Sequence, residues 1–195
     1  MHSTKFILSS ILILLGIAFI SFQLGCLHPM SESEIDQSKG LNGSFESFKN
    51  GLPINWLVYT SQSTSTGQFK IEADTMNKKE GHQSLYFQVK NCSNRGGHYS
   101  PVIAQEIDVK AGKTYHIQCW VKQFHSNCRL TLSSVDVKHA SSIQTIECTN
   151  QNNDWNLIEV DYQIPQNMNR LRFEFNVLSP GECWIDDIQV IPDLS

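Results

Sequence analysis

Residues from Leu41 onward alternate between apolar and polar side chains with a period of two, and no long stretch there has helical periodicity. The runs TYHIQCWVK (114–122) and LRFEFNV (171–177) follow this pattern closely. The side chains that share the apolar face of each run are Tyr115, Ile117, Cys119 and Val121 in the first, and Leu171, Phe173, Phe175 and Val177 in the second. Such alternation, with many β-branched and aromatic residues, predicts half-buried antiparallel strands.

Turn signals separate these runs. They include Asn50-Gly51-Leu52-Pro53, Arg95-Gly96-Gly97 and Ser179-Pro180-Gly181. About ten short strands with turns between them predict an all-β sandwich or jelly roll. Hydrophobic residues make up 40% of the chain and charged residues 17%, which is the composition of a globular protein with a core. We expect residues 41–195 to form one β-sandwich domain.

The first 25 residues have the composition of an export signal. Lys5 precedes an almost wholly apolar stretch from Phe6 to Phe22 that contains no charged residue. The segment Gln23-Leu24-Gly25-Cys26 resembles a bacterial lipobox, in which the cysteine is lipidated, although Gln23 stands where leucine is usual. This predicts a lipid anchor at Cys26, a polar tether over residues 26–40 and a location in the bacterial cell envelope, periplasmic or surface-exposed. A signal cleaved at another site and an uncleaved membrane anchor are the alternatives.

Charge and motifs exclude several classes of function. The net charge is −4 and no basic run is present, which argues against nucleic-acid binding. The seven histidines are dispersed, and the sequence has no GxSxG, HExxH or phosphate-loop motif. Acidic residues are present, but none falls in a recognisable catalytic motif. We therefore expect a protein that is not an enzyme.

Five cysteines follow Cys26, so at least one of them has no partner within the chain. Cys128 and Cys148 bracket two strand-like runs. If those runs form a hairpin, their outer ends meet and a disulfide is feasible. Cys119 lies on an apolar strand face, where we expect a buried free thiol.

An ordered series of short motifs resembles carbohydrate-binding modules of the family 4/9/22 type. The series is Asn42-Gly43-Ser44-Phe45-Glu46, Gly51-Leu52-Pro53 with Trp56, Gly81-His82-Gln83-Ser84-Leu85, Ala104-Gln105, Ala111-Gly112-Lys113-Thr114-Tyr115, Leu171-Arg172-Phe173 and Trp184-Ile185-Asp186-Asp187-Ile188. The resemblance spans about residues 41–191. It implies a galactose-binding-like β-sandwich jelly roll and a polysaccharide or glycan as the partner.

The resemblance also implies a structural calcium ion between the first and last strands. The matching positions are Glu46 and Asp186, with a backbone carbonyl near Ser44. Carboxylates and carbonyls are the oxygen ligands that calcium prefers.

Aromatic and polar side chains on strand faces are candidates for sugar binding. Trp120 lies on the polar face of its strand beside His116 and Gln118, and an aromatic face stacks well against sugar C–H groups. Arg172 belongs to a second polar strand face, with Glu174 and Asn176. The resemblance implies a stacking role for the loop aromatic Tyr99.

Two functions follow from these features. The first is an exported, lipid-anchored, non-catalytic protein that binds carbohydrate. The alternative is a jelly-roll lipoprotein that binds another protein, as an adhesin or an envelope assembly subunit, with the aromatic residues forming a contact patch.

Overall fold

The computed structural model describes residues 31–32, 34–61, 64, 67–135, 140–149 and 152–193. The predicted export signal and the predicted lipidation site Cys26 lie outside these residues. Within them, no helix is long and apolar enough to cross a membrane.

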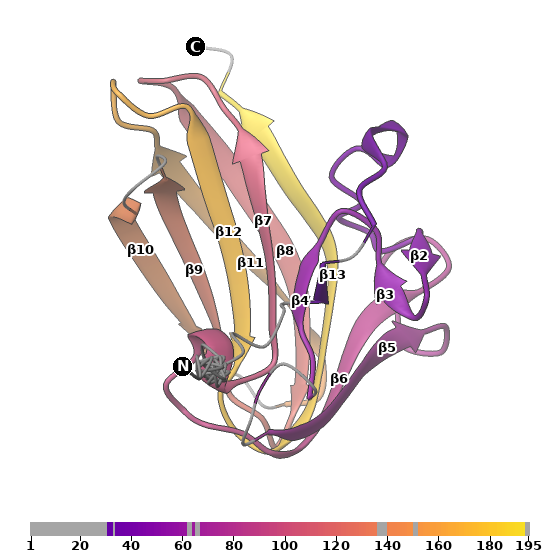
Figure 1. The fold of residues 1–195 in the computed structure, drawn as a ribbon. Helices are drawn as coiled ribbons and strands as arrows, with labels where there is room; N and C mark the ends of the chain where they lie inside the picture. Colours follow the sequence, from indigo (N-terminus) through magenta and orange to yellow (C-terminus); the bar gives the residue numbers. More distant parts are fainter. Residues whose placement is uncertain are drawn as a thin grey trace, which may run out of the picture.

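Two antiparallel sheets pack face to face (Figure 1). The six-stranded sheet has the order β1 (Ser31–Glu32), β4 (Leu57–Tyr59), β7 (Val102–Asp108), β12 (Arg170–Val177), β9 (Cys128–Val135) and β10 (Ala140–Cys148). The five-stranded sheet has the order β11 (Trp155–Gln163), β8 (Thr114–Phe124), β13 (Gly181–Pro192), β6 (Ser84–Asn91) and β5 (Gln68–Asp74). The remaining elements are the hairpin of β2 (Phe48–Lys49) and β3 (Leu52–Pro53) and the 3-10 turns η1 (Gln37–Lys39) and η2 (Gly97–Tyr99). The predicted all-β sandwich is confirmed.

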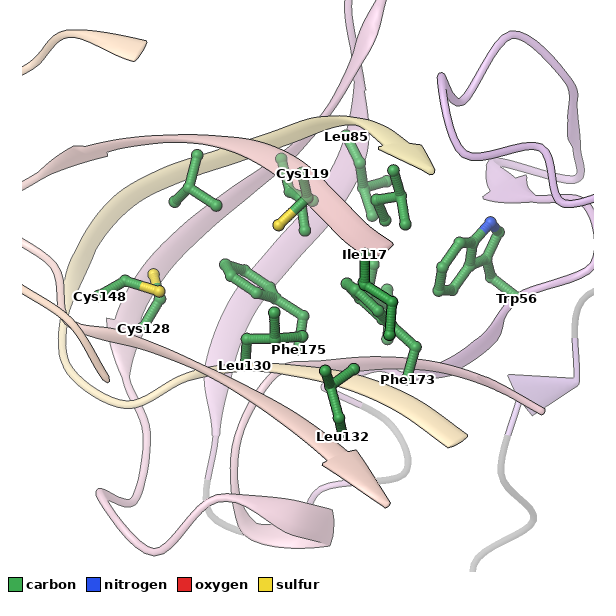
Figure 2. Packing of buried hydrophobic residues seen from close by; sticks show 14 of the residues in the cluster. Trp56, Leu85, Ile117, Cys119, Cys128, Leu130, Leu132, Cys148, Phe173 and Phe175 are labelled. Carbon is green, nitrogen blue, oxygen red and sulfur yellow. The ribbon is translucent and has the colours of Figure 1, made fainter. Parts of the chain in front are cut away.

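The core lies between the two sheets and is built from the predicted apolar faces. Along β12, the four side chains from Leu171 to Val177 that were expected to face inward are fully buried. Trp56 packs edge-on against Phe173, with ring centroids 5.7 Å apart (Figure 2). Because alternate residues of each strand fill this core, the intervening residues form the outer face of each sheet.

The segment that opens the domain contacts the last strand. The Ile188 N–H donates to the Gly43 carbonyl at 3.0 Å. A Cβ atom on Gly43 would lie 2.0 Å from the Ile188 carbonyl oxygen, so only glycine fits this approach. The Trp56 indole donates to the Asn42 carbonyl at 3.1 Å and fixes the same segment to the core.

The cysteines lie mostly inside the sandwich. Cys119 is a buried free thiol, as expected. Cys128 and Cys148 are directly opposite each other in the β9–β10 hairpin, so the predicted approach of the two strand ends is correct. Both are free thiols in this structure.

Candidate functional site

Each sheet presents its outer surface as a possible binding surface. On the six-stranded sheet, the polar face is defined by Tyr59, Arg129, Arg172, Glu174 and Asn176. On the five-stranded sheet, the aromatic face is defined by Tyr86, Trp120, Trp155 and Trp184.

A chain of charged hydrogen bonds runs along the polar face. The guanidinium of Arg172 donates from Nε and Nη2 to Glu174 Oε2, at 3.2 and 3.0 Å. Asn176 Nδ2 donates to the other Glu174 oxygen at 3.0 Å. The side chains of Arg172 and Glu174 are only 25% and 20% exposed, so this network is held in place and partly shielded from water.

The η2 turn closes one end of the polar face. The Gly97 N–H donates to Asn176 Oδ1 at 2.6 Å, and Arg129 Nη2 donates to the Arg95 carbonyl at 3.0 Å. Tyr99, in the same turn, is 40% exposed, and the Arg95 guanidinium lies 5.9 Å from its ring. Tyr99 therefore belongs to the same end of the molecule as the Arg172 network.

Tyr59 lies on the same face as that network, with one strand between them. Strand β7 separates β4 from β12, and its residues on this side of the sheet, Val102 and Ala104, are buried. Burial raises the pKa of Tyr59, the Arg172 guanidinium opposes this rise and the Glu174 carboxylate adds to it. A phenol ring, a guanidinium and a carboxylate thus share one surface.

A pocket of about 880 Å³ adjoins the polar face at the start of β4. Because β4 begins at Leu57, opposite Ala104, residues 105–108 of β7 have no partner in β4, and these residues line the pocket. Arg172, Glu106 and Arg170 line the pocket, and so does Gln105. Gln105 lies opposite the core residue Phe173, on the inner side of the sheet, and among the described residues its buried Oε1 has no hydrogen-bond donor.

The aromatic face is covered by the turn after β5. Trp184 is 6% exposed, stacks on Tyr86 at 4.8 Å and donates from Nε1 to Asp74 Oδ2 at 2.8 Å. Lys79 Nζ lies 3.6 Å from the centre of the Trp120 ring, a cation–π contact. A sugar that stacked on this side of Trp120 would have to displace Lys79.

His116 and Gln118 lie beside Trp120 on β8. His116 Nδ1 is 2.9 Å from Asp161 Oδ1 on the neighbouring strand β11, and this hydrogen bond raises the pKa of the imidazole. Gln118 is opposite Glu159 in the same strand pair.

The five residues predicted to bind sugar therefore do not lie together. His116, Gln118 and Trp120 belong to the outer surface of the five-stranded sheet, and Arg172 and Tyr99 belong to the other side of the sandwich. Sequence reasoning missed Tyr59. Its signal was the short alternation Leu57-Val58-Tyr59, in which Val58 is buried.

The residues predicted to bind calcium hold a loop in this structure. Glu46 Oε1 accepts the His82 and Gln83 N–H groups at 2.8 and 3.2 Å. Asp186 Oδ2 accepts the Lys79 and Glu80 N–H groups at 2.7 and 3.0 Å. The two carboxylates thus anchor the two ends of residues 79–83.

Asp186 is a poor fit to a cation in this arrangement. Its second oxygen, Oδ1, accepts the Asp187 N–H at 2.8 Å, so N–H donors point at both oxygens. Ser44 is half-buried next to Gly43. Among the described residues, no group of three or more His, Cys, Asp or Glu side chains is placed to hold a metal ion.

Asp186 points away from the core, because its neighbour Ile185 is fully buried opposite Val121. It is nevertheless fully buried, because residues 79 and 80 cover it. Burial raises the pKa of Asp186 to about 6, against the effect of the three backbone donors.

Comparison with known proteins gives one family match. A family described as "Carbohydrate binding domain" matches residues 38–181. No curated protein matches the chain.

Several solved structures share the fold. A CBM4 structure superimposes with a TM-score of 0.58 at 17% identity, covering 78% of this chain and 98% of that one. The CBM22-1 xylan-binding domain of Paenibacillus barcinonensis Xyn10C gives 0.53 at 15% identity, covering 77% and 91%. The enzymatically active domain of bacteriophage CBA120 tailspike protein 4 gives 0.57 at 16% identity, covering 83% of this chain but 22% of that one. At such identities the likeness shows the jelly-roll fold alone.

Proposed function

Because this chain belongs to the carbohydrate-binding domain family, we propose that it is a non-catalytic protein that binds glycan on the polar face of its six-stranded sheet. The observation that carries the choice of face is the network of Arg172, Glu174 and Asn176. These side chains are held by one another before any ligand arrives.

The chemistry of this face suits a sugar. A sugar hydroxyl both donates and accepts, so it pairs best where donors and acceptors alternate. Arg172 supplies donors and Glu174 supplies acceptor oxygens. Because the charged pair is already ordered, binding orders few additional side chains.

Aromatic rings flank the network. Tyr59 is half-buried at one side of it and Tyr99 is exposed at one end. Both rings can stack on the C–H faces of a pyranose. Val102 and Ala104, on the strand beside Tyr59, are buried, so the two rings and the Arg172 network supply the accessible contacts.

The charge of this face favours an uncharged glycan. The three arginines on strands β9 and β12, Arg129, Arg170 and Arg172, are outnumbered on this face by the four acids Glu106, Asp108, Glu147 and Glu174. Such a surface has no excess of positive charge to attract an acidic polysaccharide. Because one structural neighbour is a xylan-binding domain, xylan is the first neutral polysaccharide to test.

The test is binding of the chain from residue 27 onward, which keeps every described residue, to a panel of neutral and acidic glycans by calorimetry. Saturable binding to a neutral glycan that is lost in Arg172→Ala supports the proposal. Well-folded protein that binds no glycan would overturn it, and would favour the protein-binding alternative.

We also propose that the domain is exported and anchored by lipid at Cys26. Support comes from the apolar stretch from Phe6 to Phe22 and the lipobox-like Gly25-Cys26. Metabolic labelling with a fatty acid tests this in a bacterial host. We expect label on the full chain and none on Cys26→Ser.

A further inference from the structure

Three thiols from three strands meet at one end of the core. Cys128 begins β9, Cys148 ends β10 and Cys183 lies near the start of β13. Cys128 and Cys148 are cross-strand partners, and Figure 2 shows them at the opposite end of the core from Trp56. The Sγ atoms of Cys128 and Cys183 are 2.9 Å apart.

The contact between Cys128 and Cys183 crosses the sandwich. Strand β9 belongs to the six-stranded sheet and β13 to the five-stranded sheet. Both side chains are fully buried, so neither sulfur is in contact with water. A disulfide bond is about 2.05 Å long, so closing the 2.9 Å gap requires a movement of roughly 0.9 Å.

We propose that Cys128 and Cys183 form a disulfide that joins the two sheets when the chain folds in the presence of a disulfide oxidant. With oxidised glutathione, the two thiols lose two protons and two electrons, one sulfur–sulfur bond forms in the protein, and the glutathione disulfide is reduced to two thiols. Cys148 remains a thiol beside the bond. This inference does not depend on glycan binding.

The bond is expected to form during folding and not afterwards. The thiolate is the attacking species in disulfide exchange. Burial raises the pKa of Cys183 well above its ordinary value, and raises that of Cys148 to about 12. In the closed sandwich these thiols are therefore protonated at neutral pH and inaccessible to the oxidant.

Peptide mapping tests the pairing directly. At least one lysine or arginine lies between each pair of consecutive cysteines, so trypsin places each of the five cysteines in its own peptide. The chain from residue 27 is unfolded, reduced, refolded with oxidised glutathione, alkylated and digested with trypsin. We expect the peptide ending at Arg129 to be linked to the peptide that begins at Phe173. A link between the Cys128 and Cys148 peptides, or folded protein with all five cysteines alkylated, would overturn the proposal.

Two matched variants measure what the bond does. The bond would close a loop of 55 residues. Such a loop lowers the conformational entropy of the unfolded chain and thereby stabilises the folded state. In Cys148→Ala, we expect the melting temperature of the oxidised protein to exceed that of the reduced protein by on the order of 10 °C. In Cys183→Ala the two should coincide. Equal differences in both variants would contradict the assignment.

Addition of oxidised glutathione to the protein that was folded while reduced is the kinetic control. We expect its Cys128–Cys183 bond to form far more slowly than during refolding. Equally fast formation would show that the thiols are reachable in the native state and would overturn the proposed order of events.

Discussion

Arg172 and Glu174 lie two positions apart on β12, and both Nε and Nη2 of the arginine donate to one oxygen of the glutamate. Arg172 Nη1 also lies 3.6 Å from Glu106 on β7. A guanidinium is a rigid fork, so these contacts fix where its remaining donor capacity points. The proposed glycan surface is organised around this pair.

The first prediction concerns Arg172 itself. Replacement by alanine removes the charged donors, and hydrogen bonds to charged groups contribute about 1.5–3 kcal/mol. We expect the Kd for a bound glycan to rise about 10–100-fold, measured by calorimetry. Lys70→Ala is the matched control, because Lys70 is a charged residue of the other sheet and is paired with Glu72. A Kd that does not change in Arg172→Ala would remove the polar face from the site.

The second prediction separates the two faces of the sandwich. Tyr59→Ala should weaken glycan binding, because its ring flanks the Arg172 network. Trp120→Ala should leave the Kd unchanged and lower the free energy of unfolding by about 1–3 kcal/mol, because Trp120 packs beneath Lys79. Calorimetry and urea denaturation measure the two effects. Loss of binding in Trp120→Ala alone would instead place the site on the aromatic face, with His116 and Gln118.

Much of the fold could be predicted from the sequence because local alternation determines which side chain faces the core. In β8 and β12 every expected inward residue is buried. The order of strands in a sheet depends on long-range pairing, which alternation does not encode. This is why Trp120 and Arg172 were candidates for one site, although they lie in different sheets.

Other features depend on contacts between distant segments. Asp186 is buried by residues more than one hundred positions earlier in the chain. The same limit applies to the cysteines. The expected hairpin predicted that Cys148 lies near Cys128, but Cys183 approaches Cys128 only because the two sheets pack together.

The third prediction concerns the pH dependence that arises from Asp186. Its pKa is raised by burial from the ordinary 3.8 to about 6, so the folded state binds a proton more tightly than the unfolded state. The resulting stabilisation is complete below about pH 4 and is lost as the pH rises to about 6, at up to about 1.4 kcal/mol for each pKa unit. Urea denaturation at pH 4.5 and 7.5 should therefore reveal a larger loss of stability in the wild type than in Asp186→Asn. Equal losses in the two proteins would contradict this role of Asp186.

The fourth prediction tests calcium. The proposed calcium site consists of Glu46, Asp186 and the Ser44 carbonyl, which are the positions that the family resemblance implies. If calcium binds there, the melting temperature of the wild type should rise on adding calcium and fall on adding chelator, and Glu46→Ala should lose that response. A melting temperature that does not respond to calcium in the wild type would leave Glu46 and Asp186 as anchors of residues 79–83 alone.

The last prediction concerns the junction between the opening segment and the last strand. Alanine at position 43 would place its Cβ 2.0 Å from the Ile188 carbonyl oxygen, so the backbone must move and the 3.0 Å hydrogen bond between these residues weakens. We expect Gly43→Ala to lower the free energy of unfolding by about 2–4 kcal/mol, measured by urea denaturation. Gly51→Ala is the matched control: its Cβ would meet open space, but its φ of +81° costs alanine about 1 kcal/mol. If the two variants lost equal stability, backbone conformation and not the contact with Ile188 would account for the glycine at position 43.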